Sequence, residues 1–184
     1  MCTFVHILAT RSSTGQDGWV GDIIEAHAKL TLSLRVTGVR DDGFHLIDAE
    51  MVVLDLHDTI AFTASDDVSI TVDGPYAAGV PTDGRNLVHR ALALVSRTAA
   101  MTITKQIPHG GGLGGGSADA AAVLRWAGYH DLVAASRLGA DIPFCLSGHH
   151  RARVTGIGEG IESRPSHAGT VTLIIPPLSA STPA

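Results

Sequence analysis

Residues 109–122 read His109-Gly110-Gly111-Gly112-Leu113-Gly114-Gly115-Gly116-Ser117-Ala118-Asp119-Ala120-Ala121-Ala122, with six glycines around one leucine and then a run of strong helix formers. Glycine loses more conformational freedom on folding than any other residue, so such a run needs a reason. A close approach of the backbone to a ligand, or several positive φ angles in succession, would supply one. Free amides of a glycine loop and of a first helical turn suit a phosphate group. We favour this interpretation over a flexible linker, because linkers mix glycine with serine.

The composition limits the class of protein. The chain has 184 residues, of which 45% are apolar, and this is enough for one domain with its own core. The net charge of −5 and the lack of a basic run argue against a nucleic-acid partner. No apolar stretch is long enough to span a membrane, and the N-terminus is a poor secretory signal. We therefore expect a cytoplasmic protein that binds neither nucleic acid nor membranes.

Cysteine and histidine give no sign of a metal or redox site. Cys2 and Cys145 lie far apart and form no motif, so we expect reduced, inert thiols. The ten histidines do not fall into metal-ligand spacing, and the adjacent pair His149 and His150 would point to opposite faces of a strand.

Hydrophobic periodicity predicts the elements on either side of the glycine loop. Residues 26–40 alternate as a half-buried strand with Leu30, Leu32, Leu34 and Val36 on one face, and the Asp41-Asp42-Gly43 turn leads into a second strand. Asn86 and Ser117 are predicted to cap the next two helices. The remaining expectations are strands within 59–73, at 101–107 and within 151–162, a short helix at 131–138 and a last strand at 170–178. This order predicts an α+β fold with a mostly antiparallel sheet and helices on one side.

The residues that follow the loop exclude several common kinds of phosphate-binding site. The glycines satisfy the pattern G-x-G-x-x-G, but no second strand with a terminal acid comes after them at the distance that a dinucleotide site requires. No lysine follows the loop, so it is not a Walker A motif, and the protein-kinase signatures are absent from the sequence. The loop must therefore take its cation from another segment.

Three segments in order resemble the GHMP kinase superfamily, and within it the 4-diphosphocytidyl-2-C-methyl-D-erythritol kinase family. They are AHAKLTLSLRVTGVRDDGFHLID from Ala26, IPHGGGLGGGSADAAAVL from Ile107 and LGADIPFCLSG from Leu138. The resemblance implies the superfamily's N-terminal fold, which is similar to domain 2 of ribosomal protein S5. It also implies ATP-dependent phosphorylation of the 2-hydroxyl of a cytidine-diphosphate-linked polyol in non-mevalonate isoprenoid synthesis, with Mg²⁺.

The same resemblance implies roles for single residues. Asp141 matches the catalytic acid, which would accept or orient the hydroxyl proton of the substrate, and Lys29 matches the lysine that steadies Asp141 as a carboxylate and balances phosphoryl charge. Phe44 and His45 would face the cytidine by stacking and hydrogen bonding. The implied ATP-binding residues are Pro108, His109, Gly110, Gly111, Gly112, Leu113, Gly114, Gly115, Gly116, Ser117 and Ala118, with Asn86 and Lys105 at the border and Ser117 also reaching Mg²⁺.

The chain also departs from the family. Phe44 stands where tyrosine is usual, Thr31 where asparagine is usual, and Ala118 where a second serine or asparagine is usual. Family members continue into a C-terminal domain with a G-S-G-x-x-x-F motif, which this sequence lacks. We expect an N-terminal extension over residues 1–25 and the ATP-binding domain over 26–184. Three interpretations stay open: an active kinase, a nucleotide-binding module that needs another chain, and a kinase of another small alcohol.

Overall fold

A long β-hairpin forms the largest part of the sheet. The structure, a computed structural model, describes residues 21–166 and 169–174. Strand β1 (Ile23–Val39) pairs antiparallel with β2 (His45–Thr63). The predicted turn between them is confirmed, because the Arg40 amide donates to the Phe44 carbonyl and the Gly43 amide donates to the Arg40 carbonyl. β1 begins three residues before the predicted domain start at residue 26.

Shorter strands extend the sheet from the edge of β2 that lies opposite β1. They are β3 (Ser69–Asp73), β4 (Ala100–Thr104), β5 (Arg151–Gly156) and β6 (Gly160–Ser163). The path of hydrogen-bonded neighbours is β3-β4-β2-β5-β6, in which β4 pairs with one end of β2 and β5 with the other end, while β1 pairs with the opposite edge of β2. Only the β3–β4 pair is parallel among the described strands. The prediction of a mostly antiparallel sheet is confirmed.

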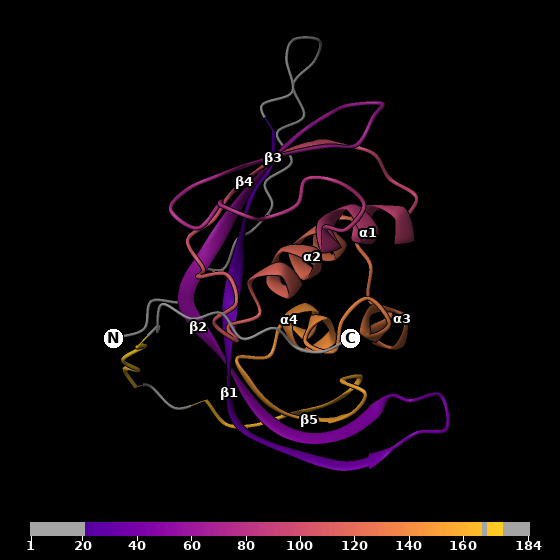
Figure 1. Cartoon of the computed structure of the whole chain (residues 1–184), viewed down its shortest axis with the longest axis vertical. Coiled ribbons are helices and arrows are strands. Elements are labelled where there is room, and N and C mark those ends of the chain that lie inside the picture. The colour runs from indigo at the N-terminus through magenta and orange to yellow at the C-terminus, as the bar shows by residue number, and fades with distance from the viewer. Residues whose placement is uncertain (1–20, 167–168, 175–184) are drawn as a thin grey trace.

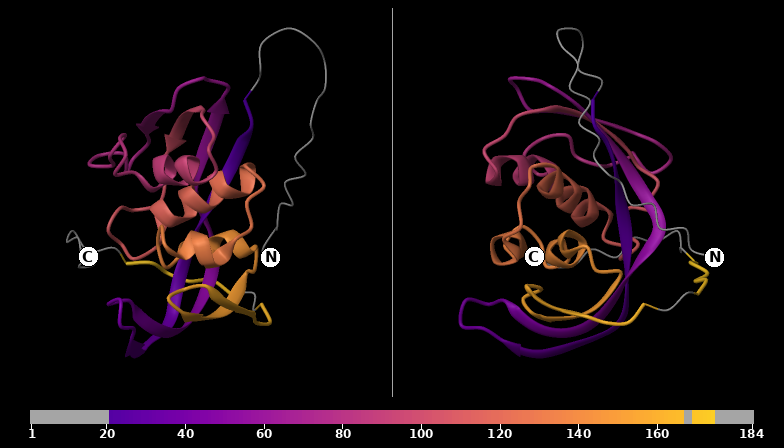
Figure 2. Two further views of the ribbon diagram at one scale, coloured as in Figure 1. Left: turned by 90° about the vertical axis from the view of Figure 1, so that its right-hand side faces the viewer. Right: turned by 180° about the vertical axis from the view of Figure 1, so that it is seen from behind.

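The helices cover one face of this curved sheet, as predicted (Figures 1 and 2). They are α1 (Leu87–Leu94), α2 (Gly115–Trp126), α3 (Leu132–Ser136) and α4 (Ile142–Ser147). Alanines at 120, 121 and 122 of α2 are fully buried, and their small side chains let the helix lie close to the sheet. Trp126 at the end of α2 stacks on Phe62 of β2 with ring centroids 4.5 Å apart. None of the helices in the described part of the chain is both long and apolar enough to cross a membrane.

The predicted buried face of β1 is wrong for its second half. Leu32, Leu34 and Val36 are 51%, 59% and 59% exposed. The pairing with β2 shifts between Thr31 and Ser33, so the alternation does not continue on one face. Beyond this shift the hairpin also projects past the helices, so no second layer covers it (Figure 1).

The structure differs from the sequence-based prediction at three other elements: one helix start, one additional helix and one strand. Helix α2 begins at Gly115 with Gly114 as its N-cap, so Ser117 lies within the first turn instead of capping it. Helix α4, which starts next to Asp141, was not predicted. No strand forms over residues 170–174, and the rest of the predicted last strand lies outside the described residues, as does Cys2. Cys145 is free, and burial, together with the charge of Asp141, raises the pKa of its thiol to about 12.

Candidate active site

The glycine loop has the backbone conformation that its sequence predicts. Gly110, Gly112 and Gly114 take φ angles of +76°, +69° and +69°, which side chains other than hydrogen rarely allow. Leu113 between them is only 4% exposed and packs in the main core. The buried leucine therefore anchors the loop, while His109 and the glycines at 110, 111 and 112 remain exposed.

The loop ends in free amides at the start of α2. The first backbone hydrogen bond of the helix runs from the Ala118 amide to the Gly114 carbonyl over 2.8 Å. The amides of Gly115, Gly116 and Ser117 precede it and so have no carbonyl within the helix to accept from them. Free amides at the start of a helix of this length, twelve residues, suit an anion. Ala118 itself is buried, so neither its methyl group nor its amide is available to a ligand.

Lys29 of β1 lies directly against this loop. Its backbone amide donates to the Leu113 carbonyl over 2.9 Å. A Cβ on Gly114 would lie 2.9 Å from Lys29 Cγ and 3.0 Å from Cε, so the loop packs on the lysine stem. The loop thus gains a cation from a strand more than eighty residues earlier in the chain, as the sequence required.

The Lys29 ammonium joins the loop to Asp141. Lys29 Nζ lies 3.1 Å from Asp141 Oδ2 and donates to Thr31 Oγ1 over 3.0 Å. The Lys29 side chain is 8% exposed and that of Asp141 is 28% exposed, so the acid is the more accessible of the pair. Asp141 sits at the N-terminus of α4. A Cβ on nearby Gly139 would lie 3.8 Å from Ser117 Oγ, which brings the Asp141 segment close to the first turn of α2.

Lys105, which the resemblance puts at the border of the nucleotide, is buried beneath the glycine loop. It is 3% exposed and pairs with Asp119 of α2 over 2.7 Å and with Asp58 of β2. Asp58 also accepts the amide of Ile107 over 2.8 Å and that of Gln106. Lys105 thus supports the loop from beneath, since its Nζ would lie 3.3 Å from a Cβ on Gly115. In this conformation it does not line the surface of the loop.

This buried cluster holds one more acid than base. Burial raises the pKa of Asp119 to about 7 against the attraction of Lys105, and the negative charge of Asp58 raises it further. Burial opposes the charge of Lys105, but Asp119 and Asp58 outweigh it and raise the pKa of the lysine. Asp119 Oδ1 has no hydrogen-bond partner, whereas both oxygens of Asp58 have one. The raised pKa and the unpartnered oxygen both indicate that Asp119 takes up a proton below about pH 7.

The other predicted binding residues belong to other elements than the Lys29–Asp141 pair. Asn86 caps α1, because its side chain accepts from the Val88 amide and donates to the Pro81 carbonyl, and this confirms the predicted cap. Phe44 and His45 are exposed at the hairpin turn. Val39, next to that turn, is ten positions from Lys29 on β1, and the path of about 33 Å along this curved strand is an upper limit on their separation (Figure 2).

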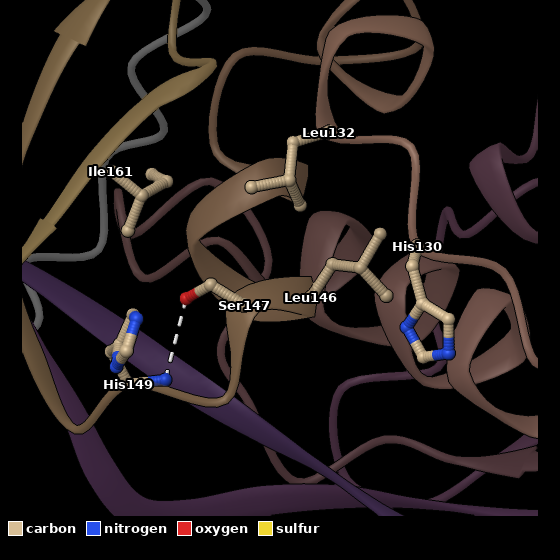
Figure 3. A pocket seen from close by; sticks show the side chains of 6 residues that line it. All are labelled: His130, Leu132, Leu146, Ser147, His149 and Ile161. Carbon is tan, nitrogen blue, oxygen red and sulfur yellow. Dashed lines mark hydrogen bonds between the residues drawn. The ribbon is translucent and has the colours of Figure 1, made fainter.

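A hollow of about 270 Å³ lies elsewhere, between α3, α4 and β6 (Figure 3). Figure 3 shows Leu132, Leu146 and Ile161 around it, with Ser147 accepting the His149 amide. His130 completes the lining. No lysine or arginine lines it, so it lacks the charge that a phosphate site needs. The Lys29–Asp141 pair beside the glycine loop is the better candidate.

This chain is similar to known proteins in sequence and in fold. The family described as GHMP kinases N terminal domain matches residues 86–149, which contain the glycine loop and Asp141. The chain has the GHMP kinase N-terminal fold. The predicted resemblance is confirmed.

Individual proteins similar to this chain narrow the comparison to one kind of kinase. A protein of Ruegeria pomeroyi named 4-diphosphocytidyl-2-C-methyl-D-erythritol kinase is 46% identical over 168 residues, covering 86% of this chain and 60% of the relative. A Jannaschia protein of the same name is 46% identical over 146 residues, covering 76% of this chain and 52% of the relative. The chain therefore spans 52–60% of the length of these relatives.

A solved structure agrees with these relatives. The crystal structure of a 4-(cytidine 5'-diphospho)-2C-methyl-D-erythritol kinase superposes with a TM-score of 0.59 at 33% identity, over 78% of this chain and 55% of that chain. The match supports the α+β architecture that the sequence predicts.

Sequence reasoning missed the roles of Asp58 and Asp119 in the buried cluster. Asp58 shares its face of β2 with the apolar residues Leu56 and Ile60, and an acid on such a face is a signal for a buried ion pair. Its partner could not be named from the sequence, because Lys105 lies 47 residues later.

Proposed function

We propose that this chain forms the ATP-binding part of a kinase that phosphorylates the 2-hydroxyl of 4-diphosphocytidyl-2-C-methyl-D-erythritol. The observation that carries the proposal is the ion pair between Lys29 and Asp141, 3.1 Å apart and held against the glycine loop by Gly114. A basic group, an acid and free helix amides meet there from three segments. Relatives that carry the name of this kinase support the choice of substrate.

The site residues fit the phosphates of ATP. The amides of Gly115, Gly116 and Ser117 offer hydrogen-bond donors, and the stem of Lys29 packs against the neighbouring Gly114. The exposed glycines at 110, 111 and 112 leave the backbone open to a ligand. The Ser117 hydroxyl is an oxygen ligand of the kind that Mg²⁺ accepts. Pro108, Leu113 and Ala118 are buried, so they shape the loop without contacting the phosphates.

Bound ATP supplies the phosphoryl group, and the residues of this chain position the acceptor. The Asp141 carboxylate, the more exposed member of the pair, accepts the proton of the attacking hydroxyl as the new oxygen–phosphorus bond forms and the bond between the γ-phosphorus and ADP breaks, so that ADP leaves. Lys29 holds this carboxylate in place and compensates negative charge on the transferred group. Phosphoryl transfer depends mainly on such positioning and charge compensation. Phe44, which is 47% exposed, offers a ring on which the cytosine stacks, and His45 offers a hydrogen bond.

The test is phosphoryl transfer by the chain itself, with ATP, Mg²⁺ and the cytidine-linked substrate. We expect ADP and the singly phosphorylated product by mass spectrometry, and no product with mevalonate or homoserine as acceptor. ATP affinity is measured separately by calorimetry on the same folded sample. ATP binding without product would contradict the kinase and favour a nucleotide-binding module. Product with another alcohol only would contradict the proposed substrate.

A further inference from the structure

A second cluster of chemically active side chains lies on β1 and β2. Glu25 and His27 are two residues apart on β1, so they share a face, and His57 of β2 pairs with His27 in the strand register. Their neighbours Ala26 and Asp58 are fully buried on the other face, toward the core. Side-chain exposures of 33%, 38% and 36% for Glu25, His27 and His57 make the cluster accessible to a small ion.

The donor atoms of the cluster have the spacing of metal ligands. His27 Nε2 lies 3.2 Å from Glu25 Oε2, and His57 Nε2 lies 3.7 Å from Glu25 Oε1. One ligand atom from each residue lies within 4.8 Å of the others. Ligands 2.0–2.2 Å from a tetrahedral zinc ion are about 3.3–3.6 Å apart. Small side-chain movements would therefore bring all three onto one ion.

A hydrogen bond of Nδ1 orients each histidine ring so that its Nε2 faces the cluster. His27 Nδ1 lies 3.0 Å from the Leu54 carbonyl, and His57 Nδ1 lies 2.8 Å from the Asp55 carbonyl. A carbonyl only accepts, so each Nδ1 carries the proton, and Nε2 of a neutral ring presents a lone pair. A hydrogen bond from the second ring nitrogen to a carbonyl is the usual orienting contact of a histidine that binds a metal.

The irregular pairing of β1 and β2 supplies these carbonyls. Between the pairs His27–His57 and Lys29–Val53, three residues of β2 lie opposite one of β1. Leu54 and Asp55 belong to this bulge, and bulges redirect backbone and side chains locally. The two rings, with centroids 5.1 Å apart, and the carboxylate therefore present three ligand atoms to one small space.

We propose that Glu25, His27 and His57 bind one zinc-class divalent ion on the face of the hairpin away from the helices. Two imidazoles and a carboxylate suit Zn²⁺, whereas Mg²⁺ prefers octahedral oxygen ligands, so this site is separate from the Mg²⁺ of the proposed kinase. Water fills the fourth position. The ion joins β1 to β2 where their regular pairing is interrupted, and it stabilises the folded chain.

The test is Zn²⁺ titration of the whole metal-free chain without an affinity tag, with excess Mg²⁺ and no ATP. We expect one equivalent bound, a tetrahedral visible spectrum with Co²⁺ and a higher Tm with Zn²⁺. Loss of outer-shell partners alone weakens metal binding 10–100-fold, so H27A, H57A and E25Q should each weaken it at least about 100-fold. H130A, an exposed histidine outside the cluster, is the matched control.

Circular dichroism of each metal-free variant shows whether it is folded, and E25Q changes the charge of the cluster with the least change of shape. Absence of zinc binding by the folded chain would overturn the proposal. So would affinity that survives all three ligand substitutions, or a loss in H130A equal to that in H27A.

Discussion

Gly114 meets two separate requirements at one position. Its φ of +69° disfavours any side chain, and the space where a Cβ would lie is filled by the stem of Lys29. The sequence predicts the first requirement, because glycine runs favour positive φ. It does not reveal the second, since Lys29 is distant in the chain and only the fold brings its stem to the loop.

Gly114→Ala should therefore be less stable than Gly112→Ala. Both positions have a φ of +69°, but a Cβ on Gly112 has nothing within 4 Å. The two variants share the backbone strain, and only Gly114→Ala adds overpacking, which costs about 1–3 kcal/mol. The free energy of unfolding in urea measures the difference. Equal losses in the two variants would show that Gly114 is not packed on Lys29.

Helix α2 is held to the sheet by the buried cluster of Asp58, Lys105 and Asp119. The cluster joins the first half of α2 to β2 and to the segment after β4, directly below the glycine loop. Its charges matter because a buried charge without a partner is costly. The proton that Asp119 takes up offsets the excess of acid, so the attachment of α2 depends on pH.

Asp119→Asn should flatten the dependence of stability on pH. The pKa of Asp119 is raised by burial to about 7, so between about pH 4 and about pH 7 the folded chain binds more protons than the unfolded chain. Its contribution to stability is present at the acidic end and falls as pH rises toward 7. Asparagine keeps an oxygen for Lys105 but does not titrate. Urea unfolding at about pH 5 and about pH 8 measures the change.

Asp66→Asn, at an exposed position between β2 and β3, is the matched control and should keep the pH dependence of the parent chain. If Asp119→Asn and the parent chain lost the same free energy of unfolding between the two pH values, the assignment of the proton to Asp119 would fail.

At the scale of the whole molecule, local patterns predicted more than the contacts between distant segments. Alternation and turn residues predicted the antiparallel sheet, and glycine followed by alanine predicted α2. Leu34 looked buried because alternation was assumed to continue through the register shift in β1. Helix α4 was missed because it has only six residues and contains Pro143, although proline is favoured in a first turn.

In the candidate site, too, the contacts between distant segments could not be predicted from local patterns. The Lys29–Asp141 pair was implied by resemblance to a family, and the structure gives its distance of 3.1 Å. The resemblance puts Lys105 beside the nucleotide and says nothing of its ion pairs. Its partners Asp58 and Asp119 come close to it only when β2 and α2 pack together, so the sequence does not predict them. The approach of His27 to His57 depends on the register of two strands, and no spacing along the chain reveals it.

The most direct test of the central claim is the turnover of Asp141→Asn. The amide keeps the shape of the side chain but cannot take the proton of the substrate hydroxyl, and general base catalysis contributes about 10²–10⁴-fold. We expect kcat for phosphoryl transfer to fall by that factor while ATP affinity changes little, with Asp66→Asn unchanged. Turnover of Asp141→Asn within about tenfold of the parent chain would contradict the account.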